Sequence, residues 1–386
     1  MTAPLIDRVR ERLAAESTPL RPAVVAAAIR AEAGGVLGDT EVLAGLRMLA
    51  TELTGAGLLE PLLAAPGTTD VLVTAPDSVW VDDGHGLRRA DVRFADETAV
   101  RRLAQRLALA AGRRLDDAQP WVDGLLAGCG GRFDVRLHAV LPPVAAAGTT
   151  ISLRVLRPSD QTLDALAAAG SIAEPAVDLL REVVAARQAF LVCGGTGAGK
   201  TTLLAALLAE VPAAERIIVV EDAAELAPAH PHLVKLVARG ANVEGAGQIT
   251  VRQLVRQALR MRPDRIVVGE VRGPEVVDLL AALNTGHDGG AGTVHANSAA
   301  EVPARLEALA APGGLDAAAL HAQLAAAIRV LVHLDRDRAG HRRVGEIAVL
   351  AVDPDRRCRA VTAWSSEHGA GPGETMLRTL LNRGRP

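Results

Sequence analysis

The feature that most constrains this chain is a phosphate-binding loop, Gly194-Gly195-Thr196-Gly197-Ala198-Gly199-Lys200-Thr201, which matches G-x-x-x-x-G-K-[ST] in full. An apolar run at 189–193 precedes the loop, and a helical pattern at 201–210 follows it. In this context the glycines let backbone N–H groups converge on phosphates, Lys200 reaches the β- and γ-phosphates, and Thr201 ligates Mg²⁺. The plainer alternative is a glycine turn that ends a strand, but a full chance match is rare. The sequence therefore predicts an ATP and Mg²⁺ site on this loop, continued by Thr202.

Length, aromatic content and net charge limit the number of domains and the kinds of partner that the chain can have. Its 386 residues exceed one ordinary core, so we expect two domains. Aromatic residues are only 2% of the chain and the formal net charge is −3, which argues against base stacking and against general attraction to nucleic acid. We therefore expect no nucleic-acid partner.

Cysteine spacing and hydropathy predict the compartment. Cys129, Cys193 and Cys358 form no C-x-x-C pair, which favours reduced thiols over a disulfide framework or a zinc site. Asp7 and Glu11 interrupt the apolar residues at the N-terminus, so no signal peptide is visible. No stretch reaches the ~18 apolar residues of a transmembrane helix. We expect a cytoplasmic protein.

Changes in hydrophobic period divide the chain into three parts. Residues 1–60 have helical spacing, with apolar residues such as Val42 and Leu46. Residues 61–157 predict a compact α+β domain, and 157–160, with Pro158, predict a linker. Residues 158–386 alternate strand and helix, which predicts an α/β domain with a parallel sheet buried on both faces. We expect a helix at 97–111 and strands at 71–73, 79–81, 133–137, 150–155, 189–193, 216–220, 265–268, 328–334 and 344–350.

Two of these strands run into acidic residues. The strand at 265–268 leads into Gly269-Glu270, where a carboxylate can lie beside Mg²⁺ and orient a water for attack on the γ-phosphate. The strand at 216–220 leads into an acidic segment, Glu221-Asp222-Ala223-Ala224-Glu225. These acids either lie at the ligand-binding edge of the sheet or begin a helix with Asp222 as its N-cap. The pattern leaves both readings open.

Residues 286–297 predict a glycine-rich loop that contains His287 and His295. The histidines are either satisfied structural groups or groups that sense phosphate and position water or metal. Upstream, Arg252, Arg256 and Arg260 recur at helical spacing and predict one basic stripe. That stripe fits a solvated face, a nucleic-acid contact, or arginine fingers that reach a neighbouring subunit.

The order of these motifs resembles the type II/type IV secretion ATPase superfamily, and segments 258–273 and 284–289 are most similar to its tight-adherence (Flp-type) pilus assembly branch. The resemblance covers residues 60–350 and implies a RecA-like P-loop ATPase domain preceded by a smaller α+β N-terminal domain. It also implies a ring-shaped homo-hexamer on the inner face of the cell membrane, which drives an inner-membrane platform protein.

Motif positions in that family imply roles for individual residues. Lys200 and Thr201 bind phosphate and Mg²⁺, and Glu270 is a further metal ligand. The implied catalytic residues also include Glu221, Glu270, His287, His295, Arg132, Arg136 and Arg154. The absence of C-x-x-C pairs argues against the zinc-containing general-secretion branch.

Three functions remain open at this point. The chain is a motor for pilus assembly or protein secretion, a conjugation- or DNA-transfer-associated ATPase, or a nucleotide-gated scaffold with slow hydrolysis. Both carboxylates and both histidines favour a working enzyme over a scaffold. The acidic net charge counts against the DNA-transfer reading.

Overall fold

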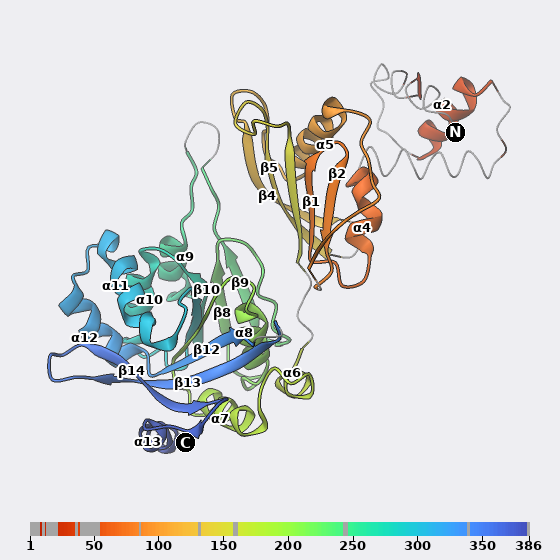
Figure 1. Ribbon diagram of the computed structural model, residues 1–386. Coiled ribbons are helices and arrows are strands. Elements are labelled where there is room, and N and C mark those ends of the chain that lie inside the picture. The colour runs from red at the N-terminus through yellow and green to blue at the C-terminus, as the bar shows by residue number, and fades with distance from the viewer. Residues whose placement is uncertain are drawn as a thin grey trace. The chain divides into compact units, whose positions relative to one another are not determined.

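A computed structural model describes residues 8–9, 12, 22–34, 38, 55–84, 86–129, 133–156, 161–241, 246–337 and 340–383. The chain divides into two compact units, Met1–Arg157 and Pro158–Pro386 (Figure 1). The helical spacing around Val42, the linker at 157–160 and Arg132 lie outside the described residues. Within the described ranges, no helix is both long and apolar enough to cross a bilayer.

The N-terminal unit is built on an antiparallel sheet in which the described strands have the order β3-β2-β1-β6-β5-β4. These strands are β1 (Asp70–Ala75), β2 (Ser78–Asp82), β3 (Leu87–Arg89), β4 (Trp121–Cys129), β5 (Phe133–Val140) and β6 (Thr150–Leu156). Its helical segments are α2 (Pro22–Glu32), the 3₁₀ turn η1 (Gly57–Leu59), α4 (Glu60–Ala64) and α5 (Glu97–Ala110). The four strands and the helix predicted for residues 61–157 are therefore confirmed.

Helix α5 covers one face of this sheet. Its start is fixed by Asp96, whose carboxylate accepts a hydrogen bond from the Ala99 amide, and its apolar positions, among them Val100, Leu103 and Leu107, are buried in the core of the unit. Strand β4 was not predicted. A Cβ on its Gly124 would lie 2.7 Å from the Cβ of Ala111, so this glycine allows the end of α5 to approach, and it also disguises the strand pattern.

The C-terminal unit is built on a sheet whose nine described strands have the order β15-β14-β13-β12-β7-β11-β10-β8-β9. The strands from β12 to β9 in this order are parallel, and β13, β14 and β15 are added as an antiparallel edge. They are β7 (Phe190–Gly194), β8 (Ile217–Glu221), β9 (Leu233–Val237), β10 (Arg265–Val271), β11 (Ala291–Val294), β12 (Val330–Arg336), β13 (Arg342–Val352), β14 (Cys358–Ser365) and β15 (Gly369–Ala370). The predicted parallel sheet and the late hairpin, β12 with β13, are confirmed.

Helices cover both faces of this sheet (Figure 1), because successive apolar side chains of each central strand point to opposite sides. In β7, Phe190 and Val192 belong to one core cluster, whereas Leu191 and Cys193 belong to the other. The first cluster includes α6 (Leu163–Ala168), α7 (Glu174–Ala185), α8 (Lys200–Ala209) and α13 (Glu374–Arg383). The second includes α9 (Val251–Ala258), α10 (Glu275–Leu283), α11 (Val302–Ala310) and α12 (Ala317–Ala327), with the 3₁₀ turns η2 (Ala299–Glu301) and η3 (Ala311–Gly313) beside α11. The α/β fold class is therefore confirmed.

Candidate nucleotide site

The phosphate-binding loop joins the end of β7 to the start of α8, as the sequence predicts. Gly197 and Gly199 have φ values of 69° and 97°, which favour glycine. A Cβ on Gly194 would lie 2.6 Å from the carbonyl oxygen of Leu334 on the neighbouring strand β12. The loop therefore needs its glycines for backbone conformation and for close approach.

The side chain of Lys200 folds back over this loop. Its amine donates hydrogen bonds to the carbonyl oxygens of Gly194 at 3.0 Å and Gly195 at 2.8 Å. Burial lowers the pKa of Lys200, and the nearby carboxylate of Glu270 partly offsets this. The positive charge is thus already held at the point where phosphate oxygens would gather.

Strands β10 and β11 bring Glu270 and His295 together beside Lys200. His295 Nε2 lies 2.6 Å from Glu270 Oε1, and His295 Nδ1 lies 3.4 Å from the Lys200 amine. A hydrogen bond from Nε2–H to the carboxylate leaves Nδ1 with a lone pair that faces the ammonium group. The result is a continuous polar chain from Glu270 through His295 to Lys200, in which Glu270 and His295 are about one-third exposed or more and Lys200 is buried.

Glu221 occupies a different environment at the end of β8. Its side chain is 5% exposed, and Oε1 accepts hydrogen bonds from the amides of Leu226 at 2.8 Å and Glu225 at 3.2 Å. Oε2 is buried and has no hydrogen-bond partner among the described residues. Burial raises the pKa of Glu221 to about 7, although the two amides lower it. The carboxyl group is therefore able to gain or lose a proton near neutral pH.

Gly269 explains how these two carboxylates fit on adjacent strands. A Cβ on Gly269 would lie 2.6 Å from Cγ of Glu221, so only glycine leaves room for this side chain. Glycine is therefore required before Glu270 for a steric reason that the sequence pattern alone did not reveal.

The rest of the acidic segment does not begin a helix. Residues 222–232 have no regular helix, and Asp222 forms an ion pair of 2.5 Å with Arg272, which also lies 3.8 Å from Glu270. The N-cap reading of Asp222 is therefore wrong. The carboxylates lie at the carboxyl edge of the sheet, where ligands bind in folds of this kind.

The predicted glycine-rich loop at 286–297 is wrong in part, because residues 291–294 form the buried strand β11. A Cβ on Gly292 would lie 2.9 Å from the carbonyl oxygen of Val268, so the small residues reflect crowding between β10 and β7. The two histidines therefore lie on opposite edges of the sheet. His295 follows β11 at the phosphate edge, whereas His287 precedes it and faces the carbonyl of Ala282 at 3.1 Å. The structure does not bring His287 to the loop in this chain.

The N-terminal arginines lie in the other unit. Arg136 and Arg154 are direct cross-strand neighbours on β5 and β6. Each forms an ion pair of 2.9 Å with an acid of its own sheet, Arg136 with Asp123 and Arg154 with Asp70.

The predicted arginine stripe is partly neutralised. Helix α9 ends at Ala258, so Arg260 lies beyond it, and the expectation of one continuous helical stripe is wrong. Arg252 and Arg256 both form ion pairs with Asp278 of α10, at 2.6 and 2.7 Å. These two arginines join α9 to α10, which leaves Arg260 as the member of the stripe whose side chain makes neither a hydrogen bond nor an ion pair with the residues that the structure describes.

The donors needed for Mg²⁺ are present near the loop. Thr201 and Thr202 are half-buried in the first turn of α8, and their hydroxyls have no hydrogen-bond partner in the described ranges. The carboxylate of Glu270 is half-exposed. Mg²⁺ prefers hard oxygen donors and binds through one or two protein groups together with phosphates and waters, so these residues fit the ion. No cluster of three or more His, Cys, Asp or Glu residues suited to a metal occurs in the part of the chain that the structure describes.

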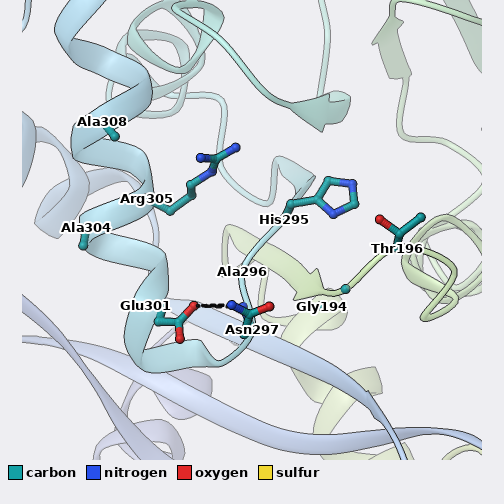
Figure 2. A pocket seen from close by; sticks show the side chains of 10 residues that line it. Gly194, Thr196, His295, Ala296, Asn297, Glu301, Ala304, Arg305 and Ala308 are labelled. Atoms are coloured by element: carbon teal, nitrogen blue, oxygen red, sulfur yellow. Dashed lines mark hydrogen bonds between the residues drawn. The ribbon is translucent and has the colours of Figure 1, made fainter.

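Two arginines that the sequence analysis did not single out lie at this edge. Arg336, at the end of β12, donates a hydrogen bond of 2.9 Å to the carbonyl oxygen of Gly197. Arg305, on α11, lines a cavity of 580 Å³ beside the loop, together with His295 and Thr196 (Figure 2). The signal for Arg336 is the pairing of β12 with β7, which places Leu334 opposite Gly194, and single-sequence patterns do not give strand order.

Comparisons with known proteins agree with this geometry. A family model described as "Type II/IV secretion system protein" matches residues 52–376. The chain is 74% identical over 347 residues to a protein of Mycobacterium tuberculosis named provisionally for conjugal transfer, covering 90% of this chain and 98% of that one. It is 32% identical over 269 residues to the conjugal transfer protein TrbB of Rhizobium radiobacter, covering 68% and 77%. The crystal structure of the pilus retraction motor PilT with bound ADP has a similar fold, with a TM-score of 0.54, 22% identity, and coverage of 76% and 81%.

Proposed function

The chain belongs to the type II/IV secretion system protein family, and we propose that it is a magnesium-dependent ATPase that drives pilus assembly or protein secretion through a membrane platform. The observation that carries this proposal is the polar chain from Glu270 through His295 to Lys200, which ends on the carbonyls of the phosphate-binding loop. A loop that served only as a structural turn would not need a carboxylate and a histidine aligned on its lysine.

Lys200 is the phosphate-binding cation in this proposal. In the free loop its amine is bound to two neutral carbonyls, those of Gly194 and Gly195. Phosphate oxygens carry full charge and make stronger hydrogen bonds than carbonyls, so the amine exchanges partners when a nucleotide arrives. His295 then lies next to the amine and the terminal phosphates, with its tautomer held by Glu270.

Two carboxylates divide the work of hydrolysis. Glu221, with a pKa of about 7, is suited to accept a proton from the attacking water near neutral pH. Glu270 orients His295 and, with Thr201, would hold Mg²⁺. When bound, Mg²⁺ neutralises charge on the β- and γ-phosphates.

Assembly and partners follow from the family resemblance. We expect a homo-hexamer at the cytoplasmic face of the inner membrane that acts on a platform protein, and we assign the chain to the tight-adherence pilus branch. Arg136 and Arg154 are expected to stabilise phosphate charge together with Arg132, whereas His287 has no such role in the site of its own chain. The ion pairs of Arg136 and Arg154 are solvent-accessible, and pairs of this kind contribute only about 0–1 kcal/mol, so they exchange partners at little cost.

A conjugation-associated ATPase is the second candidate, because the two relatives named above carry conjugal transfer names. The structure offers little support for a direct DNA contact through the arginine stripe, since Asp278 pairs with Arg252 and Arg256. A nucleotide-gated scaffold is a third candidate, and the aligned Glu270, His295 and Lys200 count against it.

The deciding experiment measures steady-state ATP hydrolysis against protein concentration, with the molar mass from light scattering at each point. Turnover that rises as a species of about six subunits forms supports the ring motor, and Lys200→Ala serves as the inactive control. A stable oligomer without turnover would favour the scaffold. Stimulation by single- or double-stranded DNA would favour the conjugation-associated reading, and its absence would favour the pilus or secretion motor.

A further inference from the structure

The cavity beside the loop is bounded by three segments of the C-terminal unit. The loop contributes Gly194, Gly195 and Thr196, the segment after β11 contributes His295, Ala296 and Asn297, and α11 with the turn before it contributes Glu301, Ala304, Arg305 and Ala308. Figure 2 shows the Arg305 side chain extending from α11 toward the side of the cavity where His295 and Thr196 lie. The cavity is therefore a place where a charged group on α11 faces the start of the phosphate-binding loop.

The position of Lys200 shows which end of a nucleotide this cavity would meet. The lysine of this motif reaches the β- and γ-phosphates. Its amine is bound to the carbonyls of Gly194 and Gly195, two of the residues that line the cavity. The cavity therefore opens on the terminal-phosphate end of the site.

Arg305 is the charged group in this cavity whose side chain has no partner among the described residues. The side chain is exposed and makes no hydrogen bond or ion pair with them. Glu301, the other charged residue of α11 and its preceding turn that lines the cavity, is occupied, because its Oε2 accepts hydrogen bonds of 3.1 Å from the amide and the side chain of Asn297. The flanking residues on α11, Ala304 and Ala308, are too small to fill the space.

We propose that Arg305 binds the γ-phosphate of ATP and thereby distinguishes ATP from ADP. A guanidinium group can donate two parallel hydrogen bonds to a phosphate, and its charge is permanent. Arg305 would also join the phosphate to the core of the unit, because α11 buries Val302, Leu306 and Leu309 there. The turn before α11 is in addition hydrogen-bonded to the segment after β11, through Glu301 and Asn297. This inference rests on the proposed function, since it requires ATP at the loop.

The test compares two nucleotides on the full chain. Binding of ADP and of an ATP analogue with a non-hydrolysable β–γ bond, each with Mg²⁺, is measured by titration calorimetry for the wild type, Arg305→Ala, Arg305→Lys and Arg357→Ala. Arg357 is a matched control, because it is also exposed, its side chain has no partner in the described ranges, and it lies on the β13–β14 turn at the opposite edge of the sheet.

Arg305→Ala is expected to weaken binding of the ATP analogue by roughly 10- to 100-fold and to leave the affinity for ADP within about twofold of the wild-type value. Arg305→Lys should recover part of the loss, and Arg357→Ala should behave as the wild type. Equal losses for both nucleotides, or no loss for either, overturn the assignment. If the wild type binds neither nucleotide, the proposed function falls as well.

An acid from a second copy of the chain is the other anion that Arg305 could meet. Light scattering of the same samples gives their oligomeric state and so distinguishes the γ-phosphate from an acid of a second copy. A selective loss of analogue binding in samples that are monomeric supports the γ-phosphate, whereas a loss that appears only in oligomers overturns it.

Discussion

Two buried charged side chains, Arg265 at the amino edge of the large sheet and Glu221 at its carboxyl edge, differ in how completely they are hydrogen-bonded. At the amino edge, Arg265 is 1% exposed, and its guanidinium donates to Glu215 at 2.7 Å, to the Val184 carbonyl at 2.9 Å and to the Gly289 carbonyl at 3.4 Å. At the carboxyl edge, the buried Oε2 of Glu221 has no partner among the described residues. A buried polar atom without a partner costs about 1–3 kcal/mol. Every nitrogen of the Arg265 guanidinium therefore has a partner, whereas one oxygen of the Glu221 carboxyl is left for a ligand or a proton.

The first prediction tests the amino edge. Arg265→Ala should lower the free energy of unfolding by about 3–5 kcal/mol, because it leaves the carbonyls of Val184 and Gly289 without this donor and opens a space in the core. Glu215, which is part-buried, keeps its ion pair with Arg187. Urea unfolding measures the loss, and Arg357→Ala on the same edge should change it by no more than about 0.5 kcal/mol. The folded variant should bind ADP as the wild type does. If the folded variant binds ADP more weakly than the wild type, Arg265 affects the nucleotide site as well as the stability of the fold.

The second prediction tests the carboxyl edge. Glu270→Gln should reduce the turnover number for ATP by about 10²–10³-fold, because His295 loses its carboxylate and Mg²⁺ loses a ligand. ATP should remain bound, and the free energy of unfolding should change by less than about 1 kcal/mol, since the ion pair is half-exposed. Steady-state kinetics and urea unfolding measure the two effects. Undiminished hydrolysis would show that this carboxylate is misassigned.

The third prediction concerns the pH dependence that Glu221 introduces. Its pKa rises from 4.5 to about 7 on folding, so between these values the folded state binds more protons than the unfolded state. Stability is therefore greatest below the unfolded pKa and falls as pH rises through 7, by about 3 kcal/mol at most. Urea unfolding of the nucleotide-free protein at pH 5 to 8 measures this slope. In Glu221→Gln, which keeps an oxygen for the Leu226 amide, the contribution should disappear. An equal change in the free energy of unfolding with pH in both proteins would contradict the raised pKa of Glu221.

The fourth prediction has the smallest expected effect. Arg336→Ala removes the hydrogen bond to the Gly197 carbonyl and with it part of the loop's order before binding. ADP affinity should fall about fivefold, which corresponds to about 1 kcal/mol, with little change in stability. Titration calorimetry resolves this difference. A loss in stability as large as that of Arg265→Ala would place Arg336 with the structural groups instead.

Much of the fold could be predicted from the sequence, because the central strands are buried on both faces. A run such as Ile217–Glu221, whose five residues are all buried, is too short for a helix and is therefore predicted as a strand buried on both faces. The loop and Glu270 could be found for a related reason, since glycine conformation and a strand-end carboxylate are local features.

What the sequence concealed depends on how strands pair. His287 and His295 are close in the chain, yet β11 separates them by four residues of extended backbone, and a strand advances about 3.3 Å per residue. Its Ala-Gly composition reflects close packing between neighbouring strands, which a pattern of glycines does not distinguish from a loop. Arg305 and Arg336 were missed because neither belongs to a motif, and their place beside the phosphate-binding loop depends on the order of strands and helices.

The use of lysine has a practical consequence. Among 42 basic residues only Lys200 and Lys235 are lysine, and Lys235 lies exposed on the edge strand β9. An acylating reagent therefore meets two side-chain amines with opposite surroundings: Lys235 is open to solvent, whereas Lys200 is buried and hydrogen-bonded to two carbonyls of the loop. The ratio of acyl groups on the two peptides, read by mass spectrometry, would report how often the phosphate-binding loop exposes its lysine. The chain thus contains both the probe and its internal reference, and no label has to be engineered into it.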